Sequence, residues 1–177
     1  MWYKIVSFVV ALSLGTIAQG QEKDCGRLSS SSFRKSVCSS IENNKAYLVK
    51  YQLQKKSGEQ SLAKILKWSR ENYDCIICRS EPGFNGGTML RKVVFEDALS
   101  VAFFFVYDAE IDMNIVEQDG KTLLDWIQDD TESNFDAMFE TDNENDQHWM
   151  LKQININTRY YNLFRNNGAK LRQELPK

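Results

Sequence analysis

The chain has 177 residues, and its 22 basic side chains nearly balance its 24 acidic ones, which leaves a net charge of −2. A chain with so little net charge lacks the overall positive field that draws proteins to nucleic acids or to anionic membranes. It contains only two prolines, and helix-forming residues dominate, so an all-β fold is disfavoured. We expect an all-α protein with no bound cofactor or metal.

The first 20 residues have the pattern of a secretory signal peptide. An apolar run extends from Ile5 to Ile17, and Ala18 and Gly20 are the small residues that precede a cleavage site. The run of about 13 residues is too short to span a bilayer comfortably. We therefore predict a secreted or periplasmic protein that is cleaved before Gln21 and has no further contact with the membrane.

The rest of the chain predicts a polar tether and a single helical domain. Residues 21–32 are polar and include four consecutive serines, which favours a tether that ends in a helix N-cap. The domain should then occupy residues 33–177. Apolar spacing and turn residues predict helices over residues 33–41, 45–56, 61–72, 90–94, 99–107 and 148–165, and another that begins at residue 122.

All four cysteines follow the expected cleavage site, and in an oxidising compartment an even number predicts disulfides. We expect Cys25 and Cys38 to pair with Cys75 and Cys78, which would tie the N-terminal helices to the end of the third helix. A Cys25–Cys38 bond is the alternative pairing. The spacing of Cys75 and Cys78 also permits a redox dithiol or half of a metal site, so a periplasmic redox or metal-handling protein is the alternative function.

Residues 129–147 carry eight acidic side chains and no lysine or arginine. This composition interrupts the helical pattern and predicts an acidic inserted loop. Because insertions on a rigid scaffold often carry binding residues, we predict that Asp142, Glu144 and Asp146 contact a partner. The alternating oxygen donors also suggest a calcium loop, although Gln147 stands where such loops need glycine.

A Thr-x-Leu motif with a glycine shortly before it occurs twice, at Thr88 and at Thr122. Threonine can cap a helix through its hydroxyl, and glycine adopts backbone conformations that other residues resist. A motif that recurs after about 33 residues is typical of a stacked helical repeat. We assign structural roles in this repeat to Gly87, Thr88, Leu90, Asp112, Asn114, Gly120, Thr122, Leu124, Asp125 and Gly168.

These residues resemble the ankyrin repeat, whose unit runs Gly-x-Thr-Pro-Leu-His-x-Ala, two helices, and Gly-Ala-Asp-x-Asn in a connecting finger. Gly120, Thr122, Leu124 and Asp125 fall on the Gly, Thr, Leu and His positions of one unit. Gly87, Thr88 and Leu90 approximate the preceding unit, with Asp112 and Asn114 in its finger. Proline is replaced in both units, by Met89 and Leu123.

The resemblance implies a short ankyrin-like solenoid of two to three helix pairs, with the acidic insertion in the last repeat. It also implies non-enzymatic binding of another protein, by a chain that we expect to be a monomer. In the finger we assign partner contacts to Asp108, Glu110, Glu117 and Gln118, and we assign no catalytic residue. A second alternative is an immunity or inhibitor protein whose acidic residues cover a basic surface.

Overall fold

The computed structural model describes residues 31–79, 84–117 and 119–176, and this part of the chain is mainly α-helical. The expected signal peptide, most of the tether, Cys25 and Gln118 lie outside the described residues. The helices are α1 (Ser31–Glu42), α2 (Ala46–Ser57), α3 (Leu62–Asn72), α4 (Met89–Phe95), α5 (Leu99–Phe103), α6 (Leu123–Glu140) and α7 (Glu144–Asn166). The short elements are η1 (Tyr73–Cys75), β1 (Ile77–Cys78), β2 (Gly87–Thr88), a π-helical turn η2 (Phe104–Asp108) and η3 (Arg172–Glu174).

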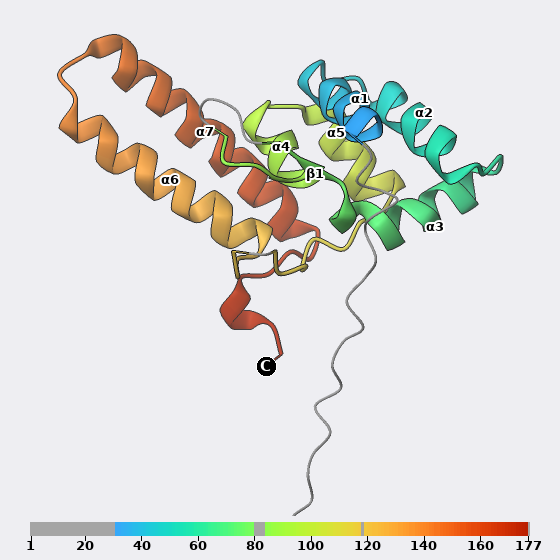
Figure 1. Ribbon diagram of the computed structural model, residues 1–177. Helices are drawn as coiled ribbons and strands as arrows, with labels where there is room; N and C mark the ends of the chain where they lie inside the picture. The colour runs from blue at the N-terminus through green and yellow to red at the C-terminus, as the bar shows by residue number, and fades with distance from the viewer. Residues whose placement is uncertain (1–30, 80–83, 118, 177) are drawn as a thin grey trace, which may run out of the picture.

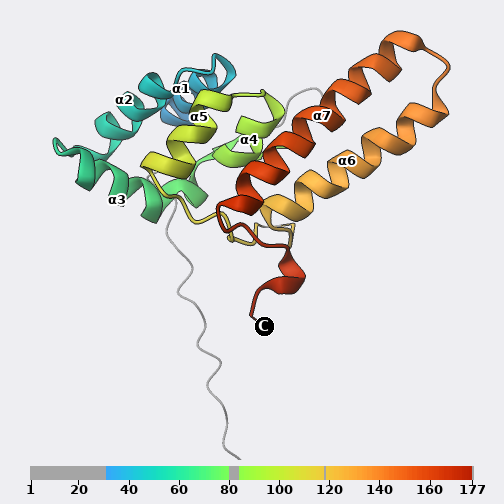
Figure 2. The ribbon, with the colours of Figure 1, turned by 180° about the vertical axis from the view of Figure 1, so that it is seen from behind.

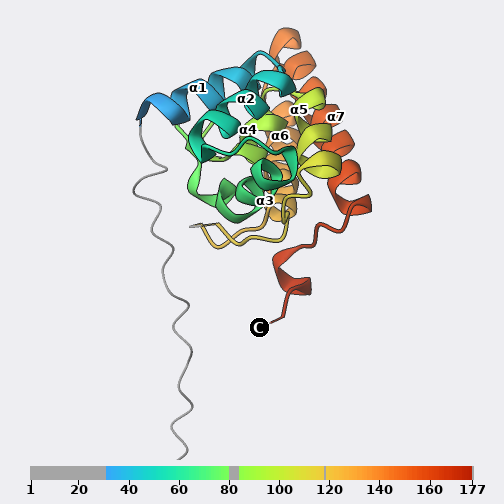
Figure 3. The same cartoon turned by 90° about the vertical axis from the view of Figure 1, so that its right-hand side faces the viewer.

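Three antiparallel helix pairs lie side by side in chain order, α1–α2, then α4–α5, then α6–α7 (Figures 1 and 3). The middle pair contacts both neighbours, because α4 packs on α1 and also on α6 and α7, and α5 packs on α2. Helix α3 follows α2 and leads through η1 into β1, which pairs antiparallel with β2.

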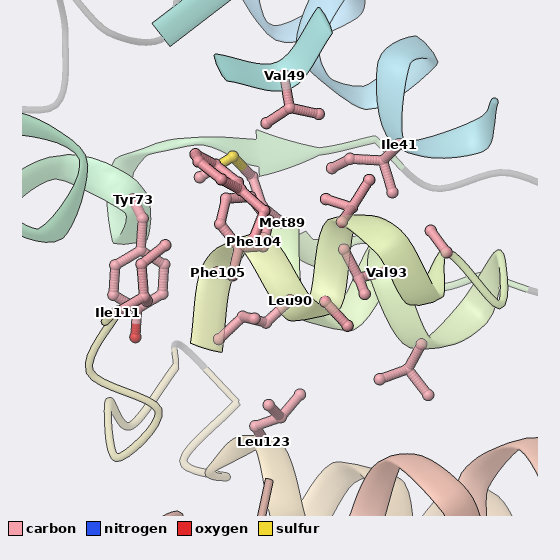
Figure 4. Close-up of a cluster of buried hydrophobic side chains, with 14 of the residues drawn as sticks. Ile41, Val49, Tyr73, Met89, Leu90, Val93, Phe104, Phe105, Ile111 and Leu123 are labelled. Carbon is pink, nitrogen blue, oxygen red and sulfur yellow. The ribbon is translucent and has the colours of Figure 1, made fainter. Parts of the chain in front are cut away.

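Helix α4 lies at the centre of the core, and every side chain from Met89 to Val94 is buried. Figure 4 shows its apolar side chains between α1 on one side and the start of α6 on the other. The buried run includes Lys92, which is 1% exposed and forms ion pairs with Glu42 of α1 (3.5 Å) and Glu96 (2.7 Å). The Phe-rich segment after α4 is buried only in part, since Phe103 is 44% exposed.

The first two helix pairs share one turn geometry. Asn44 and Asp97, which stand between the helices, both adopt left-handed backbone angles, with φ of 49° and 53°. In each turn, the backbone N–H of the next residue donates to the carbonyl five positions back, at 3.0 and 2.9 Å. Asparagine and aspartate tolerate this conformation better than most residues, so the sequence supports both turns locally.

Each of these turns also contacts the next helix pair. The Asn44 side-chain oxygen accepts a hydrogen bond from the backbone N–H of Ser100 (2.9 Å), at the start of α5. Asp97 forms an ion pair with Arg159 of α7. In both turns, the left-handed residue therefore contacts the second helix of the following pair, although the two contacts differ in kind.

The second helix of each pair also ends in a similar way. A left-handed residue follows α2, η2 and α7, namely Gly58 (φ 71°), Glu110 (φ 45°) and Gly168 (φ 94°). This conformation reverses the chain at a helix end, and glycine adopts it without strain. Glu110 adopts the same left-handed conformation, although it has the Cβ that makes this conformation strained.

The acidic loop predicted at residues 129–147 is wrong, because this stretch belongs to two long helices. Helix α6 runs to Glu140, α7 begins at Glu144, and only three residues connect them. The acidic side chains therefore lie on an extended helical hairpin.

Polar residues lie in the seam between α6 and α7, so the sequence of this hairpin lacks the apolar periodicity that usually indicates helices. Thr131 and Asn134 donate side-chain hydrogen bonds to carbonyls one turn earlier in α6, at 2.7 Å each. Asn157 of α7 is 2% exposed and donates to the Asp130 carboxylate (2.8 Å). These bonds satisfy the polar groups, so the helices pack where an apolar stripe is absent.

Candidate functional site

The cysteines form structural cross-links. A disulfide joins Cys38 of α1 to Cys78 of β1, and Cys75 is disulfide-bonded as well. No cysteine among the described residues is free. The alternative Cys25–Cys38 bond is therefore wrong, and Cys75 and Cys78 are not bonded to each other. Across residues 31–79, 84–117 and 119–176, no three acidic, histidine or cysteine side chains are grouped so that they could hold a metal ion.

A buried charge network holds the finger segment, which we define as residues 109–121 without Gln118. Arg91 of α4 donates two hydrogen bonds to Asp119 (2.6 and 2.9 Å). Its Nε lies 3.0 Å from the Glu117 carboxylate, although without hydrogen-bond geometry. The Thr88 hydroxyl donates to Glu117 (2.8 Å) instead of capping α4. Gly87 makes room for this arrangement, because a Cβ there would lie 2.6 Å from the Arg91 side chain.

The pKa values of the two carboxylates in this network are shifted in opposite directions. Burial raises the pKa of Glu117 above its usual value, although Arg91 and the Thr88 hydrogen bonds oppose the shift. The hydrogen bonds from Arg91 hold the pKa of Asp119 below its usual value. The Glu117 side chain is only 13% exposed and pairs within the fold, whereas its contact with a partner stays a prediction.

The finger segment is also fixed on its other side. The buried Tyr73 hydroxyl donates to the backbone carbonyl of Asp112, and burial raises the pKa of Tyr73. Asn114 donates to the Gly168 carbonyl (3.2 Å) and accepts from the Lys170 backbone N–H (2.8 Å). The Asp112 side chain accepts from the Asn114 backbone N–H (2.9 Å). Asn114 therefore links the finger segment to the chain that follows α7, and Tyr73 links it to η1.

Helix α6 begins with a reciprocal cap. The Thr122 hydroxyl accepts from the backbone N–H of Asp125, and the Asp125 carboxylate accepts from the backbone N–H of Thr122 (2.8 Å). Asp125 also accepts from the backbone N–H of Arg172 (2.9 Å). Gly120, with φ of 79°, turns the chain just before this cap. Leu90 of α4 and Leu124 of α6 are both buried in the core.

The most conspicuous exposed feature is the outer part of the α6–α7 hairpin, residues 129–151, which we call the arm. The arm projects beyond the other helices (Figures 1 and 2). Phe135 and Phe139 are 51% and 71% exposed, and their rings pack edge to face with centroids 4.9 Å apart. On α7, Trp149 and Leu151 are 50% and 46% exposed. Large apolar side chains exposed on one projecting element mark an interaction surface.

The arm is also strongly acidic. No lysine or arginine occurs between Lys121 and Lys152. Lys121 pairs with Asp129 at the base of the arm (2.5 Å). Six further carboxylates form no ion pair with any described residue, and all six are exposed: Glu132, Asp136, Glu140, Asp142, Glu144 and Asp146.

The structure separates the two groups of predicted contact residues. The tip of the arm carries Asp142, Glu144 and Asp146. The last two occupy the first turn of α7, where their negative charge stabilises the N-terminus of the helix. Asp108 is the last residue of η2, and Glu110 pairs with Arg70 of α3 (3.3 Å). Figure 1 shows α3 on the opposite side of the molecule from the tip of the arm, so these groups do not form one site.

No protein family, curated protein or solved structure matches this chain. Among the described helices, none is both long and apolar enough to cross a membrane. The sequence pattern did not predict the arm as a helical surface, although the i, i+4 spacing of Phe135 and Phe139 is a signal for one.

Proposed function

We propose that the protein is an exported, non-enzymatic binding module that holds another protein on its arm. A single observation carries this proposal: exposed aromatic rings stand among unpaired carboxylates on a projecting hairpin. The apolar side chains favour contact with a protein surface, and the carboxylates favour a basic one.

The expected energetics fit this role. Phe135, Phe139 and Trp149 are each at least half exposed, and burying that half would contribute roughly 1 kcal/mol per side chain. The unpaired carboxylates would accelerate encounter with a basic partner and would reject an acidic one. Binding should therefore weaken as the salt concentration rises.

The rest of the molecule fits a scaffold. We propose that the three helix pairs are a short, degenerate ankyrin-like stack, with the last pair extended into the arm. The shared turns at Asn44 and Asp97 support this, as do the left-handed residues that end the second helices. The disulfides favour an oxidising compartment, which supports a secreted or periplasmic location.

The same acidic surface also fits the second candidate, an immunity or inhibitor protein. In that case the basic partner would be an enzyme or toxin, and binding would block its activity. This candidate is a special case of binding through the arm.

Site-specific photo-crosslinking would test the proposal. A photoreactive amino acid at Phe139 should capture a basic protein from the source organism's extracellular or envelope fraction, and about 0.5 M salt should suppress capture. Tyr47 of α2, which is 66% exposed and lies outside the arm, provides the matched control position. Equal capture from both positions, or capture that salt leaves unchanged, would contradict the proposal.

A further inference from the structure

We infer that the segment bound by the arm is a basic amphipathic α-helix, an inference that rests on the proposed function. It goes beyond that function because it names the shape of the partner as well as its charge.

The shape follows from the packing of the hairpin. Phe135 and Phe139 lie one helical turn apart, and their rings, packed edge to face, form a short stripe along the axis of α6. A helix laid along such a stripe presents apolar residues at the same i, i+4 spacing. It would complete a three-helix arrangement that α6 and α7 leave open. Met138 and Met150, which are half-buried, have flexible side chains that can adapt to its surface.

The position of this helix is also constrained. The Asp130 carboxylate of α6 accepts a hydrogen bond from Asn157 of α7 (2.8 Å) across the seam between the two helices. Separating the helices would break this bond and leave the buried Asn157 side chain without it. The bound helix must therefore lie on the outside of the hairpin, against the exposed rings.

The charge of the helix follows from the residues beside the rings. Glu132 precedes Phe135 by three positions, and Asp136 precedes Phe139 by three, so each carboxylate is a near neighbour of a ring on the helix surface. Neither carboxylate forms an ion pair with a described residue. Lysine or arginine on both sides of the apolar stripe of the bound helix would neutralise them. The arm of a second copy carries the same negative charges and would be repelled.

A direct test uses a synthetic peptide of about five helical turns, or roughly 18 residues, in which leucines recur at i, i+3, i+4 and i+7 and all other positions are lysine. A peptide of the same composition in scrambled order is the matched control, because it has the same charge but no apolar stripe. Calorimetric titration of the full-length protein should show saturable binding of the patterned peptide, at least tenfold tighter than that of the scrambled one. Circular dichroism should show that the patterned peptide gains helix on binding.

Variants locate the site. Phe135→Ala and Phe139→Ala should each weaken binding about tenfold, as expected for central aromatic contacts. Glu132→Gln combined with Asp136→Asn should weaken it several-fold at low salt and less at high salt. Tyr47→Ala, an exposed aromatic position on α2, should leave binding unchanged. All of these side chains are exposed, so the variants should stay folded.

Each alternative outcome has a distinct meaning. Equal binding of both peptides to the arm would overturn the helical partner and leave the proposed binding of a basic surface intact. No binding of either peptide, together with no crosslinking at Phe139, would overturn both proposals. Salt-sensitive self-association of the protein that Phe139→Ala abolishes would show that a second copy occupies the arm, and would also overturn the inference.

Discussion

Replacing Arg91 with alanine should lower the free energy of unfolding by about 3–5 kcal/mol at neutral pH. Arg91 is 5% exposed on its side chain and makes two hydrogen bonds to Asp119, at 2.6 and 2.9 Å. Its Nε lies 3.0 Å from Glu117, whose side chain is 13% exposed. Removing Arg91 leaves the Glu117 charge buried without a cation, which is the costly case for a buried ion pair. The change can be measured as a shift of the urea midpoint without a change in slope.

The loss of stability caused by Arg91→Ala should depend on pH, and both carboxylates should make this loss larger at higher pH. The pKa of Glu117 is raised by burial in the folded protein, so the stability it contributes below its unfolded pKa is lost as pH rises through the folded pKa. Without Arg91 that pKa rises further, and the loss grows. The pKa of Asp119 is lowered, so its contribution is present above its unfolded pKa and is lost as pH falls through the folded pKa. The difference between wild type and variant should therefore be larger near pH 7 than near about pH 4.

Arg70→Ala is the matched control. Arg70 also pairs with a carboxylate of the finger segment, Glu110, at 3.3 Å, but the two side chains are 42% and 68% exposed. A surface pair of this kind contributes about 1 kcal/mol or less. Equal losses for Arg91→Ala and Arg70→Ala would refute the reasoning, since burial of the network would then add nothing.

Three further changes should destabilise the fold. Cys38→Ser opens a bridge whose ends are 40 residues apart and should cost about 4 kcal/mol by loop entropy, measured by urea unfolding without reductant. Thr122→Ala removes the cap shared with Asp125 and should cost about 1–2 kcal/mol, measured in the same assay. Asn114→Ala removes the acceptor for the Lys170 backbone N–H, so hydrogen exchange at that amide should accelerate while the amides of α1 keep their protection.

The first two helix pairs could be predicted because local chemistry specifies them. The breaks after α1 and α2 fall at Asn44 and Gly58, residue types that accept left-handed angles at little cost. The start of α6 at Thr122 is also a local property, since its cap bonds a residue three positions ahead. Short-range rules are sufficient at these sites.

The arm and the charge network depend on partners that sequence order does not bring together. The seam between α6 and α7 is held by Asp130 and Asn157, which are 27 positions apart, so no apolar period in the sequence revealed it. Glu117 stood out as a finger residue free for binding because its partners, Thr88 and Arg91, belong to an earlier helix start. Acidic composition alone does not distinguish a helix surface from a loop, nor a buried carboxylate from an exposed one.

The arm also bears on how this protein can diversify. Its outer half projects beyond the helices that form the core (Figures 1 and 2), so few core contacts fix its length. Adding or removing about seven residues, or two helical turns, from both α6 and α7 would keep the seam in register and change the reach by roughly 10 Å. Recognition could therefore evolve by changes in arm length and side chains, while the disulfide, the capped helix and the buried arginine preserve the scaffold.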